Sequence, residues 1–334
     1  MCDNLYCKHL FNSLAFHQLN VRLCTTLCVG EIISNYQEKN AEELAQKILQ
    51  TRERIKQDFK NGMLPKECVE CIYKCKENSE HDKIQKLDFY YWYHCNCGCY
   101  YCSYRDETKG EFSDKIKKGN PLILETLAKL YENDVVSRDG DLTVAFGGGE
   151  LGVLEEFDGM IDLFLKNNVN FVCCESSGVR YSKGVEKLLK NGKGCITVAV
   201  CSGRPELYKK IKNRDKYYQV MNNLRNYTKA AKQYWELDEH CHNVMNVISK
   251  FIILPGMNNK KEEIDLWLQE SEKYGLKHVE VSMEFCWGIH TKKGQPVEDY
   301  NYELFDYAQK RALEMELILK KNPTSMAIME KGIY

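Results

Sequence analysis

The sequence predicts an α/β protein built as an open, partial (βα)6 barrel of parallel strands. From residue 87 to residue 285, apolar strand-like runs alternate with amphipathic helical runs, and six such units follow one another. Alternation of this kind favours parallel strands joined by right-handed crossovers. The composition agrees, because 43% hydrophobic and 28% charged residues in a chain of 334 suffice for a large core and a charged surface.

Charge and hydropathy exclude two classes of partner. The net charge of −1 argues against a surface that binds nucleic acid through bulk positive charge. No apolar run approaches the roughly 20 residues that span a bilayer, and the N-terminus lacks a signal-peptide layout. We therefore expect a cytoplasmic protein with no membrane or nucleic-acid partner. Seventeen cysteines in a reducing compartment indicate metal or cluster ligation rather than disulfides.

The N-terminal part, residues 1–80, is expected to form a small cysteine-rich module of a hairpin and a helix. Ser13–Phe16 and Val21–Cys24 predict two short strands around a polar turn. A helix is expected from Asn40, where Glu43 completes a capping-box pair, to about Phe59. Residues 76–86 are charged and polar, which predicts a linker to the barrel of residues 81–300.

The barrel elements follow in order. Strands are expected at Leu87–Tyr93, Leu142–Phe146, Asn170–Cys174, Cys195–Val200, Val244–Leu254 and Lys277–Phe285. Helices are centred on Leu122–Tyr131, Leu154–Leu165, Lys183–Leu189, Asp215–Trp235 and Lys261–Tyr274. Residues 301–334 are expected to add a final helix, Tyr302–Leu319, and a tail. Sites of parallel barrels lie at the carboxyl ends of the strands, so the loops there are the candidates for function.

The loop after the first strand carries four cysteines. Cys95, Cys99 and Cys102 have the spacing C-x3-C-x2-C, with Tyr101 before the last of them. Three thiolates can hold three irons of a [4Fe–4S] cluster and leave the fourth iron open, whereas a closed electron-transfer cluster takes four. Zinc is the alternative for closely spaced cysteines. Cys97 is either a bystander or an alternative ligand.

The second strand ends in three glycines and an acid, Gly147-Gly148-Gly149-Glu150. Glycines let a ligand approach the backbone, and the carboxylate can meet a cation. A tight turn is the alternative for a glycine run alone.

Together, the cysteine spacing, Tyr101 and the Gly-Gly-Glu stretch resemble the signatures of the radical S-adenosylmethionine (radical SAM) enzymes. The resemblance implies that the open iron chelates the amino and carboxylate groups of SAM, and that an electron from the cluster releases a 5′-deoxyadenosyl radical. By it, Gly148, Gly149 and Glu150 contact the SAM amino group. Ser176 and Ser202 become candidates for ribose contact, and Arg204 for the SAM carboxylate. An N-cap of the next helix is an equal reading of Ser176.

The N-terminal module is similar to part of the SPASM/twitch domains of radical SAM enzymes, which bind auxiliary iron–sulfur clusters. Its order differs, because such domains usually follow the barrel. The resemblance implies one auxiliary [4Fe–4S] cluster, for which the first choice of ligands is Cys7, Cys24, Cys68 and Cys71. A zinc knuckle made by the same thiolates is the alternative.

The expected function is that of an enzyme that cleaves SAM reductively and abstracts a hydrogen atom from a substrate. A flavodoxin or ferredoxin is the expected reductant. The substrate is expected to be a peptide or protein, with a carbohydrate or small metabolite as the alternative. A non-enzymatic zinc or iron–sulfur electron-transfer protein is the alternative of another class, which gives no reason for the Gly-Gly-Glu stretch.

Overall fold

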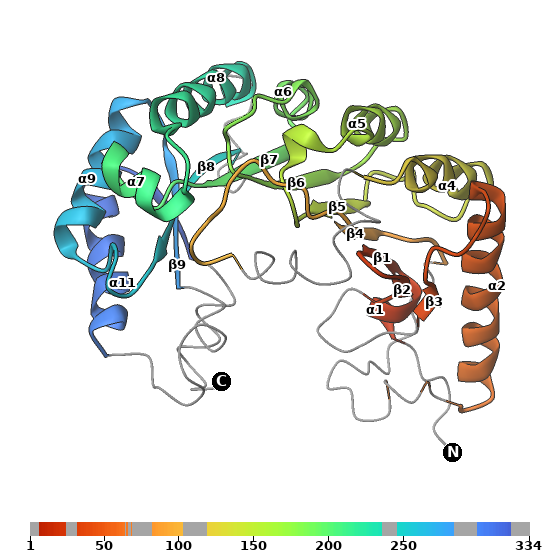
Figure 1. Ribbon diagram of the computed structural model, residues 1–334. Coiled ribbons are helices and arrows are strands. Elements are labelled where there is room, and N and C mark those ends of the chain that lie inside the picture. Colours follow the sequence, from red (N-terminus) through yellow and green to blue (C-terminus); the bar gives the residue numbers. More distant parts are fainter. Residues whose placement is uncertain are drawn as a thin grey trace. The chain divides into compact units, whose positions relative to one another are not determined.

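The structure is a computed structural model in which two compact units can be described (Figure 1). It describes residues 7–24, 32–63, 65, 68, 82–102, 119–235, 246–283 and 299–321. The first unit comprises Met1–His94, Ile116–Gly149 and Leu154–Cys173, and the second comprises Cys95–Lys115, Glu150–Val153 and Cys174–Tyr334. Among the described residues, no helix is both long and apolar enough to cross a bilayer. The predicted ligand Cys71 and the last two residues of the sixth predicted strand lie outside the described residues.

The first unit joins the N-terminal hairpin to the first two predicted barrel strands. Its elements are α1 (Lys8–Phe11), β1 (Ser13–His17), β2 (Val21–Leu23), β3 (Ile32–Ser34), α2 (Ala41–Lys60), β4 (Lys86–Tyr90), α4 (Pro121–Glu132), β5 (Thr143–Phe146) and α5 (Phe157–Lys166). The strands β1, β2 and β3 pair antiparallel, while β1 with β4 and β4 with β5 pair parallel. Phe89 stacks between Phe16 and Phe146, with ring centroids 5.1 and 4.8 Å away. These three rings fill the core where β1, β4 and β5 meet.

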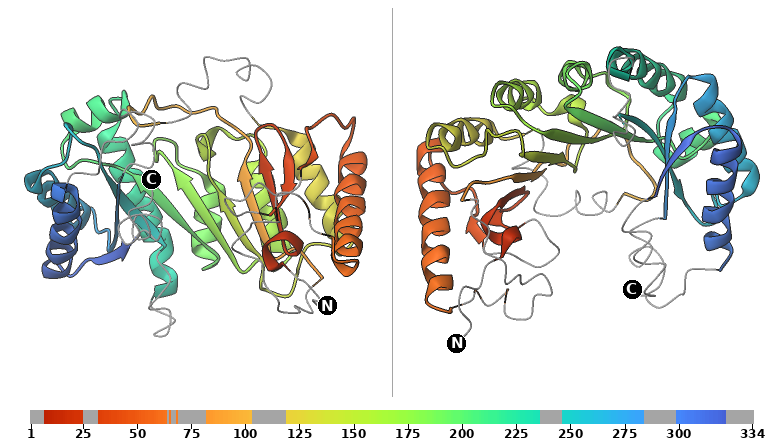
Figure 2. Two further views of the ribbon diagram at one scale, coloured as in Figure 1. Left: turned by 90° about the horizontal axis from the view of Figure 1, so that it is seen from below. Right: turned by 180° about the vertical axis from the view of Figure 1, so that it is seen from behind.

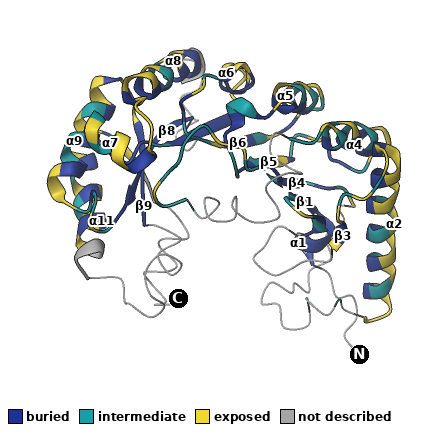
Figure 3. Ribbon diagram, viewed as in Figure 1, coloured by how far each residue is buried: buried dark blue, intermediate teal, exposed yellow. Residues whose placement is uncertain are grey.

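The second unit is a parallel sheet with helices. Its elements are a 3₁₀ turn (Leu151–Val153), the part of β6 (Phe171–Ser176) from Cys174 onward, α6 (Lys183–Lys190), β7 (Gly194–Ala199), α7 (Pro205–Lys212), α8 (Tyr217–Trp235), β8 (Val247–Ile253), α9 (Lys261–Lys273), β9 (His278–Met283), α11 (Asp299–Glu314) and β10 (Ile318–Lys321). The strands β7, β8, β9 and β10 pair parallel in that order. Every residue of β8 and β9 is buried (Figure 3). The largely apolar sequence of β8, VISKFII, is typical of a strand covered on both faces.

One face of this sheet packs against α9 (Figure 2). The indole Nε1 of Trp267 donates to Ser249 Oγ at 2.8 Å, and its ring lies 5.1 Å from that of Phe251. Because side chains alternate along a strand, Lys250 and Ile252 point to the opposite face. That face is the one on which the candidate site lies.

Local sequence explains where α2 begins and ends. The side chain of Asn40 accepts a hydrogen bond from the Glu43 backbone N–H at 2.9 Å, which confirms the predicted N-cap. The helix ends at Lys60, and Gly62 then adopts a left-handed φ of +74°. Glycine takes this conformation at little cost, so the predicted stop is confirmed as well.

Among the described residues, five elements were not predicted, namely α1, β3, the 3₁₀ turn Leu151–Val153, α7 and β10. The predicted helix Tyr302–Leu319 is wrong at its C-terminal end, because α11 stops at Glu314 and Glu316 has a left-handed φ of +54°. The chain then forms β10, whose residue Leu319 pairs in parallel register with Val279 of β9. Sheet pairing by the β-branched and aliphatic pair Ile318-Leu319 outweighs the helical pattern that preceded it.

Arg52 is expected to stabilise the first unit through buried hydrogen bonds. It is 3% exposed, and its guanidinium donates to the carbonyl oxygens of Phe11 at 2.5 Å and Asp82 at 2.8 Å. Hydrogen bonds from charged groups contribute about 1.5–3 kcal/mol each. We expect Arg52→Met to lower the free energy of unfolding by about 3 kcal/mol in urea denaturation of the metal-free protein.

The matched control is Arg54→Met on the same helix. Arg54 forms an exposed i,i+4 ion pair with Asp58, so its replacement is expected to cost less than about 0.5 kcal/mol. Equal losses for the two variants would show that the buried hydrogen bonds of Arg52 do not hold the unit together.

Candidate active site

The predicted cysteine loop follows β4 and belongs to the second unit. Its cysteines form no disulfide; Cys95 is exposed and the other three are half-buried. The Cys97 backbone N–H donates to Cys95 Sγ at 3.4 Å, and the Cys97 thiol hydrogen-bonds with the thiols of Cys95 and Cys99. The Cys102 N–H donates to the Cys99 carbonyl oxygen at 3.2 Å, which closes a turn. Three of the four sulfur atoms are therefore neighbours.

The donors of this loop fit an iron–sulfur cluster in kind and number. Cysteine thiolates are the usual ligands of such clusters, and the loop offers four thiols within eight residues. In the described part of the chain, no three His, Cys, Asp or Glu side chains are already arranged as a metal site. The fit therefore rests on the chemistry of the four thiols and on the buried ammonium of Lys212 beside them.

The end of α7 holds the loop through the backbone. The N–H groups of Gly98 and Tyr100 donate to the carbonyl oxygens of Lys212 (3.1 Å) and Ile211 (2.8 Å). Arg214 Nε donates to the Asn96 carbonyl oxygen at 2.5 Å. These carbonyls are among the last of the helix, which have no partner within it. The loop satisfies them and is fixed in return.

A buried network extends from α7 to the loop. Lys212 is 1% exposed, and its ammonium donates to the Tyr101 hydroxyl at 2.5 Å. The Tyr101 oxygen lies 3.8 Å from Cys201 Sγ, and Tyr101 packs against the apolar cluster of Cys201, Ile211, Ile252 and Leu254. Burial alone lowers the pKa of Lys212, but the neighbouring sulfur atoms, with Cys201 first and Cys99 next, outweigh it and raise this pKa. Lys212 therefore presents a positive charge to the thiols.

Glu150 follows the glycines after β5 and is hydrogen-bonded to the carboxyl end of β6. Its carboxylate is 1% exposed and accepts hydrogen bonds from Ser176 Oγ at 2.7 Å and from the Ser177 N–H at 2.6 Å. Ser177 Oγ in turn donates to Asn96 Oδ1 of the cysteine loop at 3.0 Å. The structure thus brings together two predicted SAM contacts, Glu150 and Ser176, beside the loop that carries the predicted iron ligands.

The glycines before Glu150 belong to the first unit, where they meet the chain after β4. A Cβ on Gly148, whose φ is +123°, would lie 2.9 Å from the Trp92 carbonyl oxygen. A Cβ on Gly149 would clash with the His94 carbonyl oxygen and lie 2.7 Å from the Trp92 ring. Both positions therefore require glycine because the chain's own backbone passes close by. Their predicted contact with SAM stays a prediction.

Ser202 and Arg204 lie just before α7, and Arg204 is its N-cap residue. Ser202 is fully buried, and its hydroxyl accepts from the Arg204 N–H at 2.9 Å and donates to the Arg204 carbonyl at 3.0 Å. The Arg204 guanidinium forms an ion pair with the buried Glu263 of α9. Both side chains have partners within the protein, and their contact with SAM stays a prediction.

Three buried polar residues near this site were not predicted. Asn258 donates to the carbonyl oxygens of Cys201 and Ile252, both at 2.9 Å, and so ties the end of β8 to the residue after β7. Lys250 and Glu280 form an ion pair of 2.9 Å on the face opposite α9. The strands VISKFII and HVEVSM each contain one charged residue, Lys250 and Glu280. Charged residues are seldom buried without a partner, so this pattern is a signal from which the pair could have been predicted.

Comparison with known proteins decides the family. The radical SAM superfamily matches residues 90–268, which is more than half of the chain. The chain belongs to the radical SAM superfamily. Membership implies an enzyme with a [4Fe–4S] cluster and SAM, and the predicted superfamily is confirmed. No curated protein matches the chain.

Solved radical SAM structures share the fold. SuiB of Streptococcus suis superposes with a TM-score of 0.53 at 11% identity, covering 90% of this chain and 59% of SuiB. SuiB bound to the precursor peptide SuiA gives 0.51 at 12% identity, over 96% of this chain and 73% of that one. The enzyme anSMEcpe with bound AdoMet gives 0.50 at 16% identity, over 74% and 66%. The predicted α/β fold of the radical SAM type is confirmed, and the chain spans about three fifths of the SuiB length.

The N-terminal cysteines of this radical SAM chain lie in its first unit. Cys7 and Cys24 are buried and Cys68 is half-buried; none of the three is in a disulfide. Cys24 has a left-handed φ of +78° directly after β2. The auxiliary cluster predicted for these residues and Cys71 stays a prediction.

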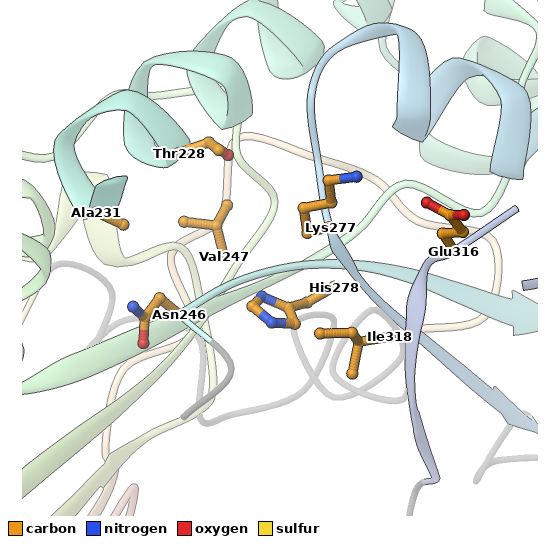
Figure 4. Close-up of a pocket in the computed structure, with 8 residues that line it drawn as sticks. All are labelled: Thr228, Ala231, Asn246, Val247, Lys277, His278, Glu316 and Ile318. Atoms are coloured by element: carbon orange, nitrogen blue, oxygen red, sulfur yellow. The ribbon is translucent and has the colours of Figure 1, made fainter. Parts of the chain in front are cut away.

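A cavity of about 370 Å³ lies at the amino ends of β8, β9 and β10 (Figure 4). Asn246 precedes β8, Lys277 and His278 begin β9, and Glu316 and Ile318 flank the start of β10. Burial lowers the pKa of His278 to about 4, so this side chain is neutral at pH 7. Tyr101 of the cysteine loop packs against the cluster of Cys201 and Leu254, which follow the carboxyl ends of β7 and β8. The cavity lies at the amino ends of the strands, so it is separate from the candidate site.

In the metal-free protein, the Cys97 thiol is expected to ionise at a higher pH than an ordinary cysteine thiol. Its hydrogen bond with Cys95, aided by burial, raises its pKa from 9.0 to about 11. Because the thiolate is the form that reacts, we expect alkylation of Cys97 by iodoacetamide to rise about tenfold per pH unit from pH 8 to pH 10 without levelling off. Mass spectrometry of the Cys97 peptide measures this rate. In the urea-unfolded chain, the alkylation rate of the same peptide is expected to bend near pH 9 and level off above it. The same curve in the folded protein would contradict the contact between Cys97 and Cys95.

Proposed function

We propose that this protein cleaves SAM reductively at a [4Fe–4S] cluster bound by Cys95, Cys99 and Cys102 and abstracts a hydrogen atom from a substrate. One observation carries the proposal: in a chain of this superfamily, the thiols of the C-x3-C-x2-C loop lie against the end of α7 beside a buried cation. When bound, the cluster and SAM together supply a 5′-deoxyadenosyl radical. A flavodoxin or ferredoxin is the proposed reductant.

The residues around the loop are proposed to bind and orient SAM. Glu150 offers a buried carboxylate to the SAM amino group, and its hydrogen bonds with Ser176 and Ser177 fix its orientation beforehand. Gly148 and Gly149 shape the turn that leads to it. Tyr101 packs against the apolar cluster that includes Ile252, and Ser202 and Arg204, just before α7, are the proposed contacts to ribose and carboxylate.

A peptide or protein is the proposed substrate. The neighbour SuiB has been crystallised with the precursor peptide SuiA, which supports a peptide, although this chain spans only part of SuiB. The face of the sheet on which Tyr101 packs also carries the Lys250–Glu280 ion pair and Ser282, whose buried hydroxyl has no partner among the described residues. Charged and hydroxyl groups there can bind the amides of a peptide. A carbohydrate or small metabolite is the alternative substrate.

The N-terminal module, residues 1–80, is proposed to bind one auxiliary [4Fe–4S] cluster through Cys7, Cys24, Cys68 and Cys71, ahead of the barrel of residues 81–300 and the C-terminal segment of residues 301–334. It would pass electrons or help to hold substrate. The alternative of a non-enzymatic metal protein is disfavoured by membership of the superfamily.

Single cysteine replacements test the proposed ligand set. We expect Cys95→Ala, Cys99→Ala and Cys102→Ala each to reduce the formation of 5′-deoxyadenosine by more than about 100-fold, because a site with two thiolates no longer holds the cluster. The measurement is liquid chromatography of the product from anaerobic, dithionite-reduced protein with SAM.

The matched control within the same loop is Cys97→Ala, which is expected to keep most of the activity. Cys7→Ala is expected to keep SAM cleavage and to lower the iron content. Full activity of Cys99→Ala combined with loss in Cys97→Ala would assign the ligands differently and overturn this set.

A further inference from the structure

Lys212 is a buried lysine whose charge has no anionic partner among the described residues. Its side chain is 1% exposed at the C-terminal end of α7. Its hydrogen-bond partner is the neutral hydroxyl of Tyr101, and no carboxylate of the described ranges pairs with it. An ammonium removed from water without an anion costs several kcal/mol, so such a group is retained only where something compensates it.

The groups that face this ammonium are sulfur atoms and an aromatic ring. Its Nζ lies 4.9 Å from the centre of the Tyr101 ring, and Tyr101 contacts Cys201 Sγ. The thiols of Cys95, Cys97 and Cys99 are its further electrostatic neighbours. Tyr101 also directly precedes Cys102 in the chain. The positive charge is thus directed at the cysteine loop itself.

We propose that Lys212 is a positioning residue that supplies the positive charge for the thiolate-bound cluster and raises its reduction potential. The inference rests on the proposed function, since it requires the cluster on Cys95, Cys99 and Cys102. One electron from an external reductant enters the cluster, and no bond forms or breaks. The reduced cluster carries one more negative charge, so a nearby buried cation stabilises it more than the oxidised form.

The side chain and the backbone of Lys212 have separable roles. The loop is held through the carbonyl oxygen of Lys212, which accepts from the Gly98 N–H at 3.1 Å. Replacing the side chain leaves this carbonyl in place. Lys212→Met keeps an unbranched apolar side chain of similar size while it removes the charge, whereas Lys212→Arg keeps the charge.

The test is a redox titration of the reconstituted protein with dithionite, followed by electron paramagnetic resonance (EPR). We expect Lys212→Met to bind iron and sulfide as the parent does, with its cluster at least about tenfold harder to reduce, which is a fall of about 59 mV for a one-electron couple. Lys212→Arg is expected to restore most of the difference. The matched control is Lys210→Met, an exposed lysine of the same helix, which is expected to leave the potential unchanged.

Each outcome has one meaning. Equal potentials for the parent and Lys212→Met, or equal falls for the Met and Arg variants, would overturn the inference. If Lys212→Met binds no iron, Lys212→Gln takes its place. Failure of both neutral variants with loading of Lys212→Arg supports a need for the charge, and failure of the Arg variant as well overturns it. A parent protein that binds no SAM-responsive cluster would instead overturn the proposed function.

Discussion

The contact between the last turn of α7 and the cysteine loop is the constraint on which the candidate site depends. A loop of eight residues with four thiols has little regular structure of its own, so the residues around it must hold it in place. The carbonyls of Ile211 and Lys212 do so, because a helix leaves its last carbonyl groups without partners and the loop supplies the N–H groups. A second contact comes from Arg214, which binds the loop at Asn96.

Polar groups from several strand ends meet around this loop in the second unit. Ser177 after β6 reaches Asn96, Cys201 after β7 reaches Tyr101, and Asn258 after β8 binds the carbonyl of Cys201. Parallel strands bring their carboxyl ends to one edge, so residues distant in sequence converge there. Rigid strands on one side and a helix end on the other hold the thiols, the buried carboxylate of Glu150 and the ammonium of Lys212 in fixed relation. Such preorganisation is what cofactor chemistry requires of a protein.

The sequence predicted the fold class, the strands β4 to β9 and the cysteine loop, because each depends on a local signal. Apolar runs at strand spacing, the Asn40 cap and the cysteine spacing all act within a few residues. What was missed depends on contacts between distant segments. Nothing in the local sequence distinguishes Lys212 from the neighbouring lysines, and only the packing of α7 buries it against Tyr101, 111 residues away. The strand β10 was hidden in a helical pattern, since it forms only by pairing with β9. Arg204 was expected to face SAM, and its pairing with Glu263 was likewise not visible from local spacing.

Three cysteines of the loop are proposed to leave one iron open for SAM. The decisive measurement is EPR of the anaerobically reconstituted, dithionite-reduced protein, recorded with and without SAM. We expect a [4Fe–4S] signal whose g values change when SAM is added, because SAM would bind the open iron. A cluster signal identical in both samples, or a protein that binds zinc in place of iron, would contradict it.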